Sequence, residues 1–285
     1  MTTIDFGLIA GISDTDYHVG PSLSSSGARK ILECPARFKW ERDNPPEPKP
    51  AFDFGHLVHR LVLGEGSVIQ IIEATDWRSK AAQLERDAAR ADGAVPVLRS
   101  EYDAAGKMRD AVFAHPTARE LFRSGHAEQS GWWVDEPTGV QLRFRPDWLT
   151  TLDGRPICID LKTTINADPA EFARSIVKWG YMSQADWYLQ GLAAHGIADA
   201  AFYFVCIEKA APYPVSVIEL DAEALAEGAH RNRRAIDLFA RCTETDIWPA
   251  YGSGIHTVSL PPWATRASLQ ADANQLITEL EGLTA

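Results

Sequence analysis

Three charged side chains near the middle of the sequence have the types and spacing of a metal-dependent hydrolytic site. Residues 157–162 alternate like a β-strand, so Asp160 and Lys162 are expected on one face of a sheet. Asp147 lies thirteen residues before Asp160, after a second alternating run at 141–146. Two carboxylates and an ammonium group on one sheet face suit a divalent metal and an activated water. A salt bridge at a strand end is the alternative interpretation, and these two strands alone leave both open.

His59 and Glu128, which precede Asp147 in the chain, are candidates for additional metal ligands. His59 follows Gly55 by four positions in a predicted helix, so a glycine packed against the sheet could aim the imidazole at the carboxylates. A partly buried histidine with ordinary hydrogen-bond partners is the alternative. Glu128 begins a predicted strand and could supply a third carboxylate, or be an exposed charge at a strand end.

Further candidates follow on a predicted helix at 181–195. Gln184 and Tyr188 are four residues apart, with Tyr181 one turn earlier on the same side. These groups could donate hydrogen bonds to phosphate oxygens or support Lys162. A buried tyrosine ring at a helix–sheet boundary, with its hydroxyl in water, is the alternative.

Two arginines precede Asp147 on the same side of its strand. Arg143 and Arg145 could hold phosphate groups of a nucleic acid, or balance nearby acidic residues.

The spacing of apolar residues predicts a mixed α/β fold that would carry these side chains. Helices are expected at 26–42 with an interruption at Pro35, and at 51–63, 77–91, 101–124, 168–180, 181–195, 222–241 and 264–283. Strands are expected at 128–134, 139–145, 157–162, 201–207 and 215–220. Because no repeat or low-complexity linker divides the chain, we expect a single domain over 1–285. It comprises a mainly helical part at 17–125, a catalytic sheet core at 126–220 and a helical part at 221–285.

The composition limits the class of protein. The net charge of -11, from 28 basic and 39 acidic residues, argues against general coating of nucleic acid but does not exclude a nuclease with a local basic channel. No apolar run reaches the ~18 residues of a membrane span, and the first residues lack the pattern of a secretory signal, so a cytoplasmic location is expected. Four scattered cysteines without a C-x-x-C pair make a zinc site or disulfide framework improbable.

The order of these motifs from Gly55 to Tyr188 is G-x-x-x-H, Glu, P-D, D-x-K and Q-x-x-x-Y. This order resembles the PD-(D/E)XK nuclease superfamily, in particular its RecB-type nuclease domains and the exonuclease VIII (RecE) family of prophage-encoded enzymes. Other segments resemble that family too: Leu23-Ser24-Ser25-Ser26, Cys34-Pro35-Ala36, residues 160–164, Gly180-Tyr181-x-x-Gln184 and Trp248-Pro249-x-Tyr251. The resemblance extends from about Tyr17 to Trp263.

The resemblance implies a fold and an activity. The fold would be a restriction-endonuclease-like core, with a central mixed β-sheet flanked by helices and helical additions at both ends. The activity would be a Mg²⁺-dependent exodeoxyribonuclease, with Mn²⁺ able to substitute, that degrades linear duplex DNA from an end and leaves single strands for recombination.

The resemblance also implies roles in metal binding. Asp147 and Asp160 would hold one or two Mg²⁺ ions, with His59 as a nitrogen ligand. Glu128 would be an additional or outer ligand, and the backbone carbonyl of Leu161 would complete the shell.

The remaining site residues would act on the water and the DNA. Lys162 would orient the attacking water or help to deprotonate it. Gln184 and Tyr188 would position the DNA strand and Lys162. Substrate contacts are expected from Arg143, Arg145 and Tyr181.

Partners and alternatives follow from the same resemblance. Duplex DNA ends are the expected substrate, a homo-oligomeric ring the expected assembly, and a single-strand annealing protein a candidate partner; no membrane is expected. Related iron–sulfur nucleases carry a cysteine near Cys34 and three near the C-terminus, where this chain offers Cys242, so no cluster is expected. The alternative functions are a non-catalytic DNA-end-binding or phage assembly module, and an endonuclease of the same superfamily.

Overall fold

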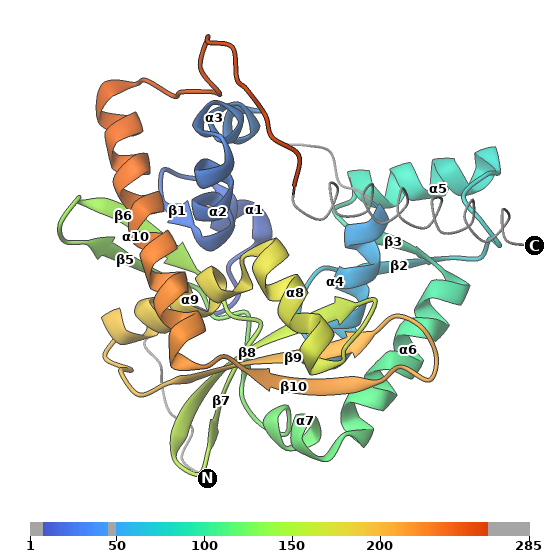
Figure 1. Cartoon of the computed structure of the whole chain (residues 1–285). Coiled ribbons are helices and arrows are strands. Elements are labelled where there is room, and N and C mark those ends of the chain that lie inside the picture. Colours follow the sequence, from blue (N-terminus) through green and yellow to red (C-terminus); the bar gives the residue numbers. More distant parts are fainter. Residues whose placement is uncertain (1–7, 45–49, 262–285) are drawn as a thin grey trace, which may run out of the picture. The chain divides into compact units, whose positions relative to one another are not determined.

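A five-stranded mixed β-sheet carries the candidate residues in the computed structural model, which describes residues 8–44 and 50–261 (Figure 1). Its strand order is β10 (Val215–Glu219), β9 (Ala201–Glu208), β8 (Arg155–Thr164), β7 (Trp148–Leu152), β4 (His126–Ala127). β8 and β9 are parallel, and the other neighbours are antiparallel. The mixed α/β fold predicted from the sequence is confirmed.

The chain forms two compact units, Met1–Ala250 and Tyr251–Ala285. Residues 251–261 of the second unit contain no helix or strand, and the helix predicted at 264–283 lies outside the described residues. Within the described ranges, no helix is both long and apolar enough to cross a membrane. The expected single-domain organisation stays a prediction.

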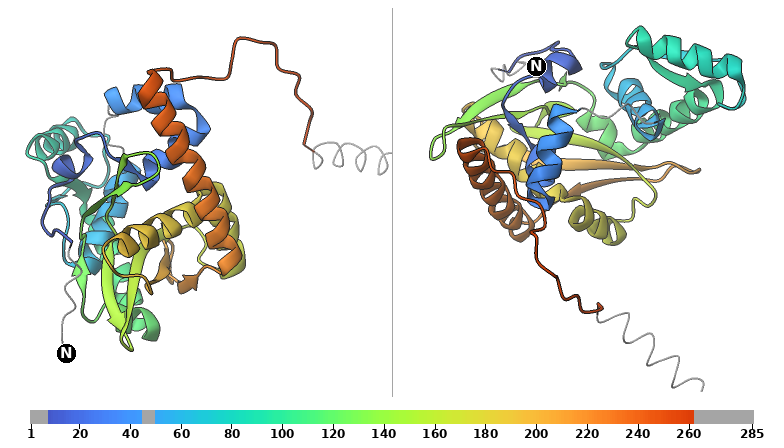
Figure 2. Two further views of the ribbon diagram at one scale, coloured as in Figure 1. Left: turned by 90° about the vertical axis from the view of Figure 1, so that its left-hand side faces the viewer. Right: turned by 90° about the horizontal axis from the view of Figure 1, so that it is seen from above.

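Two separate cores cover the two faces of this sheet, because side chains of β8 and β9 alternate between them. Cys158, Phe202, Phe204 and Cys206 face one core, which also contains residues of α2 (Ser25–Glu33), α8 (Pro169–Trp179), α9 (Tyr181–Ala194) and α10 (Ala222–Thr245). The other core contains Ile157, Ile159 and Leu161 with residues of α4 (Pro50–Leu63), β3 (Val95–Leu98), α6 (Arg99–Ala114) and α7 (Pro116–Leu121). Figure 2 shows these two helical layers from two further directions.

Two helices connect the parallel strands β8 and β9. α8 begins at the predicted cap, where the Asp168 carboxylate accepts hydrogen bonds from the amides of Ala170 and Glu171. Gly180, with a φ of 65°, ends α8 in the left-handed conformation and starts α9. A parallel pair requires such a crossover, and this one places α9 against the sheet beside β8.

The strand predicted at 128–134 is wrong at its start. β4 ends at Ala127, and Glu128 has a φ of 47° before the chain enters β5 (Gly131–Asp135). β5 belongs to a second sheet with β6 (Val140–Phe144) and β1 (Leu23–Ser24), whereas β4 pairs with β7. The chain therefore turns at Glu128 because it leaves one sheet for another.

Prolines explain how two predicted helices are divided. The interruption predicted at Pro35 is confirmed, since α2 ends and α3 (Pro35–Asp43) begins there. The helix predicted at 101–124 divides into α6 and α7 at Pro116, which cannot continue the hydrogen-bond ladder of α6. The remaining elements are α1 (Asp14–His18), α5 (Lys80–Ala91) and β2 (Ile69–Ile72), which pairs with β3.

The close contact between α9 and α10 gives a test of the packing. A Cβ atom at Gly228 would lie 2.3 Å from the backbone oxygen of Met182, so Gly228→Ala should force the helices apart. We expect a loss of about 1–3 kcal/mol in the free energy of unfolding. Gly106→Ala in α6, where a Cβ meets open space, should be neutral or stabilise by up to ~1 kcal/mol. Urea unfolding checks both, and equal effects would contradict the packing described.

Candidate active site

β8 extends beyond its neighbour β7, and the candidate residues gather at this extension. Trp148, the first residue of β7, pairs with Ile159, so β8 has no β7 residue opposite it from Asp160 onward. Two side chains bond to the free backbone of Leu161. Its N–H donates to Asp147 Oδ2 at 2.7 Å, and its carbonyl lies 2.8 Å from Nε2 of His59. Asp147 and His59 are 14 and 102 positions from Leu161 in the sequence, and they meet at this residue of the strand.

Asp160 lies next to this point, on the face of the sheet that α9 covers, and is only 2% exposed. Its Oδ1 accepts a hydrogen bond from Gln184 Nε2 at 2.6 Å. Its Oδ2 lies 2.5 Å from Lys162 Nζ in an ion pair, but accepts no hydrogen bond of good geometry in the structure. The Lys162 ammonium is therefore the partner of this buried oxygen, which has a second lone pair for a further cation.

The row of polar side chains on α9 supports this pair of charges. The Lys162 ammonium lies 4.8 Å from the ring centroid of Tyr181. The Tyr188 hydroxyl lies 3.5 Å from Gln184 Nε2, and its ring packs near Phe144 and Phe202. α9 therefore presents Tyr181, Gln184 and Tyr188 toward β8, at the helical spacing that the sequence indicated.

Burial and charge shift the pKa values of two groups in the site. Burial raises the pKa of Asp147 to about 6; Asp160 adds to the rise, and His59 and Lys162 oppose it. Burial by itself lowers the pKa of Lys162, but the carboxylates of Asp160 and Asp147 outweigh it, so that pKa is raised. Lys162 is therefore an ammonium ion at neutral pH, and the negative charge of Asp147 is poorly compensated without a further cation.

The donor groups fit a divalent metal in part. When Nε2 of a neutral His59 donates to Leu161, Nδ1 is an acceptor, and it faces Asp147 Oδ2 at 3.6 Å. Two acceptors that face each other are suitable ligands for one cation, and Asp160 Oδ2 is a further oxygen. No group of three or more histidine, cysteine or acidic side chains is arranged as a metal site among the residues that the structure describes. Mg²⁺ keeps several waters, so a small set of protein ligands suffices.

Glu128 contributes its backbone to this region. Its amide donates to the carbonyl of Asp147 at 3.1 Å, whereas its Oε1 lies beside Gly66. The acidic partner of His59 in the described structure is Asp147. A role as a third carboxylate ligand stays a prediction.

The two predicted phosphate-binding arginines are bonded within the protein. Arg143 donates through Nη1 to the backbone oxygen and the hydroxyl of Ser22. Arg145 donates from three nitrogens, over 2.8–3.0 Å, to Ser130, Asp14 and Ile12. Both guanidinium groups lie over the ring of Tyr17, at 5.4 and 4.0 Å. These contacts join the N-terminal segment to β6, and binding of substrate by either arginine stays a prediction.

Comparison of the sequence with protein-family models identifies the family of this chain. The model of a PDDEXK-like domain of unknown function (DUF3799) matches residues 24–260, which contain His59, Asp147, Asp160, Lys162 and Gln184. The chain belongs to this PDDEXK-like family. The resemblance to the PD-(D/E)XK superfamily proposed from the sequence is therefore confirmed. No curated protein matches the chain in sequence.

A solved structure shares the fold of this chain. The crystal structure of a putative exonuclease from Eubacterium rectale matches with a TM-score of 0.62 and 12% sequence identity, over 88% of this chain and 97% of that one. A phage related exonuclease from Haemophilus somnus 129PT matches with a TM-score of 0.34 and 11% identity, over 79% of this chain and 96% of that one. At these identities, the first similarity shows the fold alone.

A group of basic side chains beside Lys162 was not predicted from the sequence of this PDDEXK-like domain. Arg29 and Lys30 of α2 and Arg231 of α10 line a cavity that Lys162 also lines. The signal available in the sequence was the adjacent Arg29-Lys30 pair in the helix predicted at 26–42.

The raised pKa of Asp147 predicts an unusual stabilising substitution. A carboxyl group whose pKa is higher in the folded than in the unfolded state favours folding below the unfolded pKa, near 4. That contribution is lost as the pH rises through about 6. Without metal, Asp147→Asn should therefore stabilise the protein at pH 7.5, by on the order of 3 kcal/mol, and much less at pH 4.

Thermal unfolding in EDTA across this pH range measures the effect. If Asp147→Asn lowered the melting temperature at every pH, the carboxylate would serve mainly to hold His59 and the amide of Leu161 in place, and an unfavourable burial of its charge would be contradicted.

Proposed function

We propose that the chain is a metal-dependent exodeoxyribonuclease that degrades linear duplex DNA from an end and leaves single strands for recombination. The observation that carries this proposal is the meeting of Asp147, Asp160, Lys162 and His59 at the end of β8 in a PDDEXK-like fold. The fold similarity to a protein described as a putative exonuclease supports the choice of exonuclease over other nuclease types.

The ligands for a divalent metal are proposed from the same geometry. Asp147, Asp160, the carbonyl of Leu161 and the imidazole of His59 would hold Mg²⁺, or Mn²⁺ in its place. When bound, the metal would lower the pKa of the attacking water and stabilise negative charge on the phosphate. His59 can offer a lone pair to the metal through its neutral imidazole.

Lys162 supplies positive charge rather than a base in this proposal. Because Asp160 and Asp147 raise its pKa, the side chain stays protonated at neutral pH. An ammonium can donate hydrogen bonds to the attacking water and to a phosphate oxygen, and stabilise the charge that develops there. The side chain is about 19% exposed, so it can reach a substrate from its place beside Asp160.

α9 positions these groups. Gln184 fixes the Asp160 carboxylate through a 2.6 Å hydrogen bond, and Tyr181 supports the Lys162 ammonium with its ring. Tyr188 contacts Gln184 from the next turn of the helix. Loss of Gln184 would leave Oδ1 of the buried Asp160 without its hydrogen-bond donor.

The assembly and cellular context are also proposals. A homo-oligomeric ring around duplex DNA, a single-strand annealing protein as partner and a cytoplasmic location rest on the family resemblance of the motifs. Analytical ultracentrifugation of the purified protein tests the assembly.

Digestion of linear against covalently closed circular duplex DNA tests the function. With Mg²⁺, we expect progressive release of nucleotides from linear DNA and an intact circle. Cleavage of the circle would identify an endonuclease of the same superfamily. Binding of linear ends without any cleavage, with either metal, would identify a non-catalytic end-binding module.

A further inference from the structure

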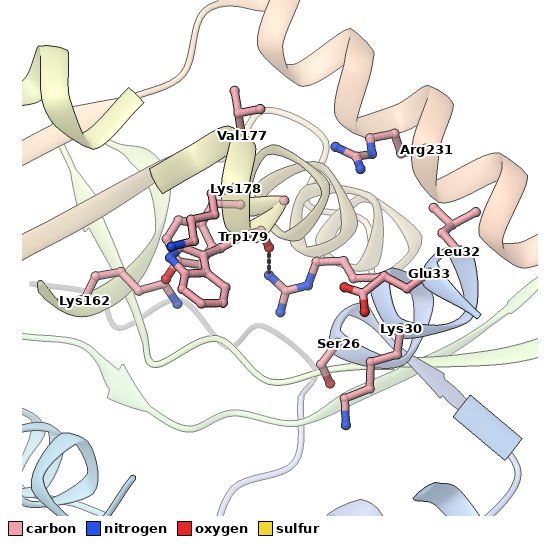
Figure 3. Close-up of a pocket in the computed structure, with 12 residues that line it drawn as sticks. Ser26, Lys30, Leu32, Glu33, Lys162, Val177, Lys178, Trp179 and Arg231 are labelled. Carbon is pink, nitrogen blue, oxygen red and sulfur yellow. Dashed lines mark hydrogen bonds between the residues drawn. The ribbon is translucent and has the colours of Figure 1, made fainter. Parts of the chain in front are cut away.

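A cavity of about 480 Å³ opens beside the candidate active site (Figure 3). Its lining comes from α2, the junction of α8 and α9, and α10, and includes Lys162 of β8. This volume lies within the range of about 300–1,000 Å³ that is usual for small-molecule sites in proteins. Figure 3 shows Lys162, Lys178 and Trp179 at one end of the cavity and Ser26 and Lys30 at the other.

The lining is basic although the chain as a whole is acidic. Arg29, Lys30, Lys162, Lys178 and Arg231 line the cavity, in a chain with a net charge of -11. The acidic residue of the lining, Glu33, lies 3.7 Å from Arg37. In the described part of the chain, no carboxylate forms an ion pair with Arg29, Lys178 or Arg231. These cations are therefore available to an anionic ligand. The substrate of a nuclease is such a ligand, because its backbone is a chain of phosphates.

An aromatic side chain stands among these cations. Trp179, the last residue of α8, is 55% exposed, and Lys178 Nζ lies 4.9 Å from its ring centroid. Its backbone oxygen accepts a hydrogen bond from Arg29 Nη1 at 2.9 Å, which ties the end of α8 to α2. Gly180 then ends α8 in the left-handed conformation, and Trp179 lies in the lining of the cavity.

We infer that this cavity binds unpaired nucleotides of the substrate strand, with Trp179 stacked on a base and Arg29 and Arg231 beside the phosphates. The inference rests on the proposed nuclease function. Proteins that bind single strands combine a basic groove with aromatic side chains in the same way. Bases within a duplex stack on each other and present no free ring face, so an exposed indole selects a base that has left the duplex.

The position of Lys162 gives the cavity its part in the reaction. Lys162 belongs both to this lining and to the ion pair with Asp160, so a phosphate next to the bound nucleotides lies against the candidate catalytic groups. The end of the duplex is therefore opened before cleavage, and the cavity holds the opened strand.

Binding of a fluorescein-labelled oligothymidine to the whole chain, in Ca²⁺ so that cleavage does not proceed, tests the inference. Trp179→Ala should weaken binding about ten-fold, whereas Trp179→Phe should retain most of it. Trp40→Ala is the matched control, because Trp40 on α3 is 63% exposed and does not line the cavity; it should bind as the wild type does. Arg29→Gln should reduce the slope of log K against log salt by about 0.7, and Arg174→Gln, on α8 outside the lining, should not.

A covalently closed circular duplex, which has neither ends nor hairpin loops, serves as competitor. The wild type should prefer the single strand, and Trp179→Ala should lose that preference. Equal binding of the strand by Trp179→Ala and Trp40→Ala would overturn the inference, while continued cleavage of linear DNA by the wild type would leave the nuclease proposal standing. The expected binding differences without any cleavage in Mg²⁺ would support the cavity and reject the nuclease.

Discussion

Lys162→Ala should reduce the rate of DNA cleavage by about 10²–10³-fold, because the side chain supplies a preorganised positive charge where negative charge develops. Asp160→Asn should cause a loss at least as large, since it removes a metal ligand and the partner of Lys162. The two variants should differ in metal affinity. Calorimetry should show weaker Mn²⁺ binding by Asp160→Asn and near-normal binding by Lys162→Ala.

Folding must be controlled in this comparison, because Lys162→Ala leaves the buried Asp160 without its cation. Lys162→Gln keeps a hydrogen-bond donor for Asp160 and removes the charge, so it should fold and show the same loss of rate. Near-normal cleavage by a folded Lys162→Gln would make the lysine structural and favour the salt-bridge interpretation.

Removal of divalent metal should abolish cleavage completely. In EDTA the purified protein should be inactive, and Mg²⁺ or Mn²⁺ should restore activity. Ca²⁺ should bind without supporting turnover, and should raise the melting temperature of the wild type through binding to the folded state. Asp160→Asn should lack that rise, which separates binding at this site from binding elsewhere. Undiminished cleavage in EDTA would rule out the mechanism proposed here.

The parts of the site that the sequence predicted are those set by local geometry. Alternation along a strand places Asp160 and Lys162 on one face whatever surrounds them, and the structure confirms this arrangement. Helical spacing likewise aligned Gln184 and Tyr188, which lie within 3.5 Å of each other. Their direction toward Asp160 depends on the crossover at Gly180.

Contacts between segments that are distant in the sequence could not be predicted from local sequence patterns. Arg143 and Arg145 form hydrogen bonds with residues that lie 121 to 133 positions earlier in the sequence. The residues around the two arginines do not indicate those partners. Glu128 begins the strand predicted at 128–134, yet the chain turns there because β4 and β5 join different sheets. β2 and β3 are four-residue strands, too short for periodicity to separate them from loops.

The anomalous scattering of Mn²⁺ in crystals of the whole chain tests the central assignment most directly. We predict a peak within about 2.0–2.4 Å of carboxylate oxygens of both Asp147 and Asp160, next to the carbonyl of Leu161. The peak should be absent from crystals of Asp160→Asn grown in the same way. A Mn²⁺ ion bound elsewhere in an enzyme that still cleaves DNA, with no peak between these two aspartates, would contradict the account.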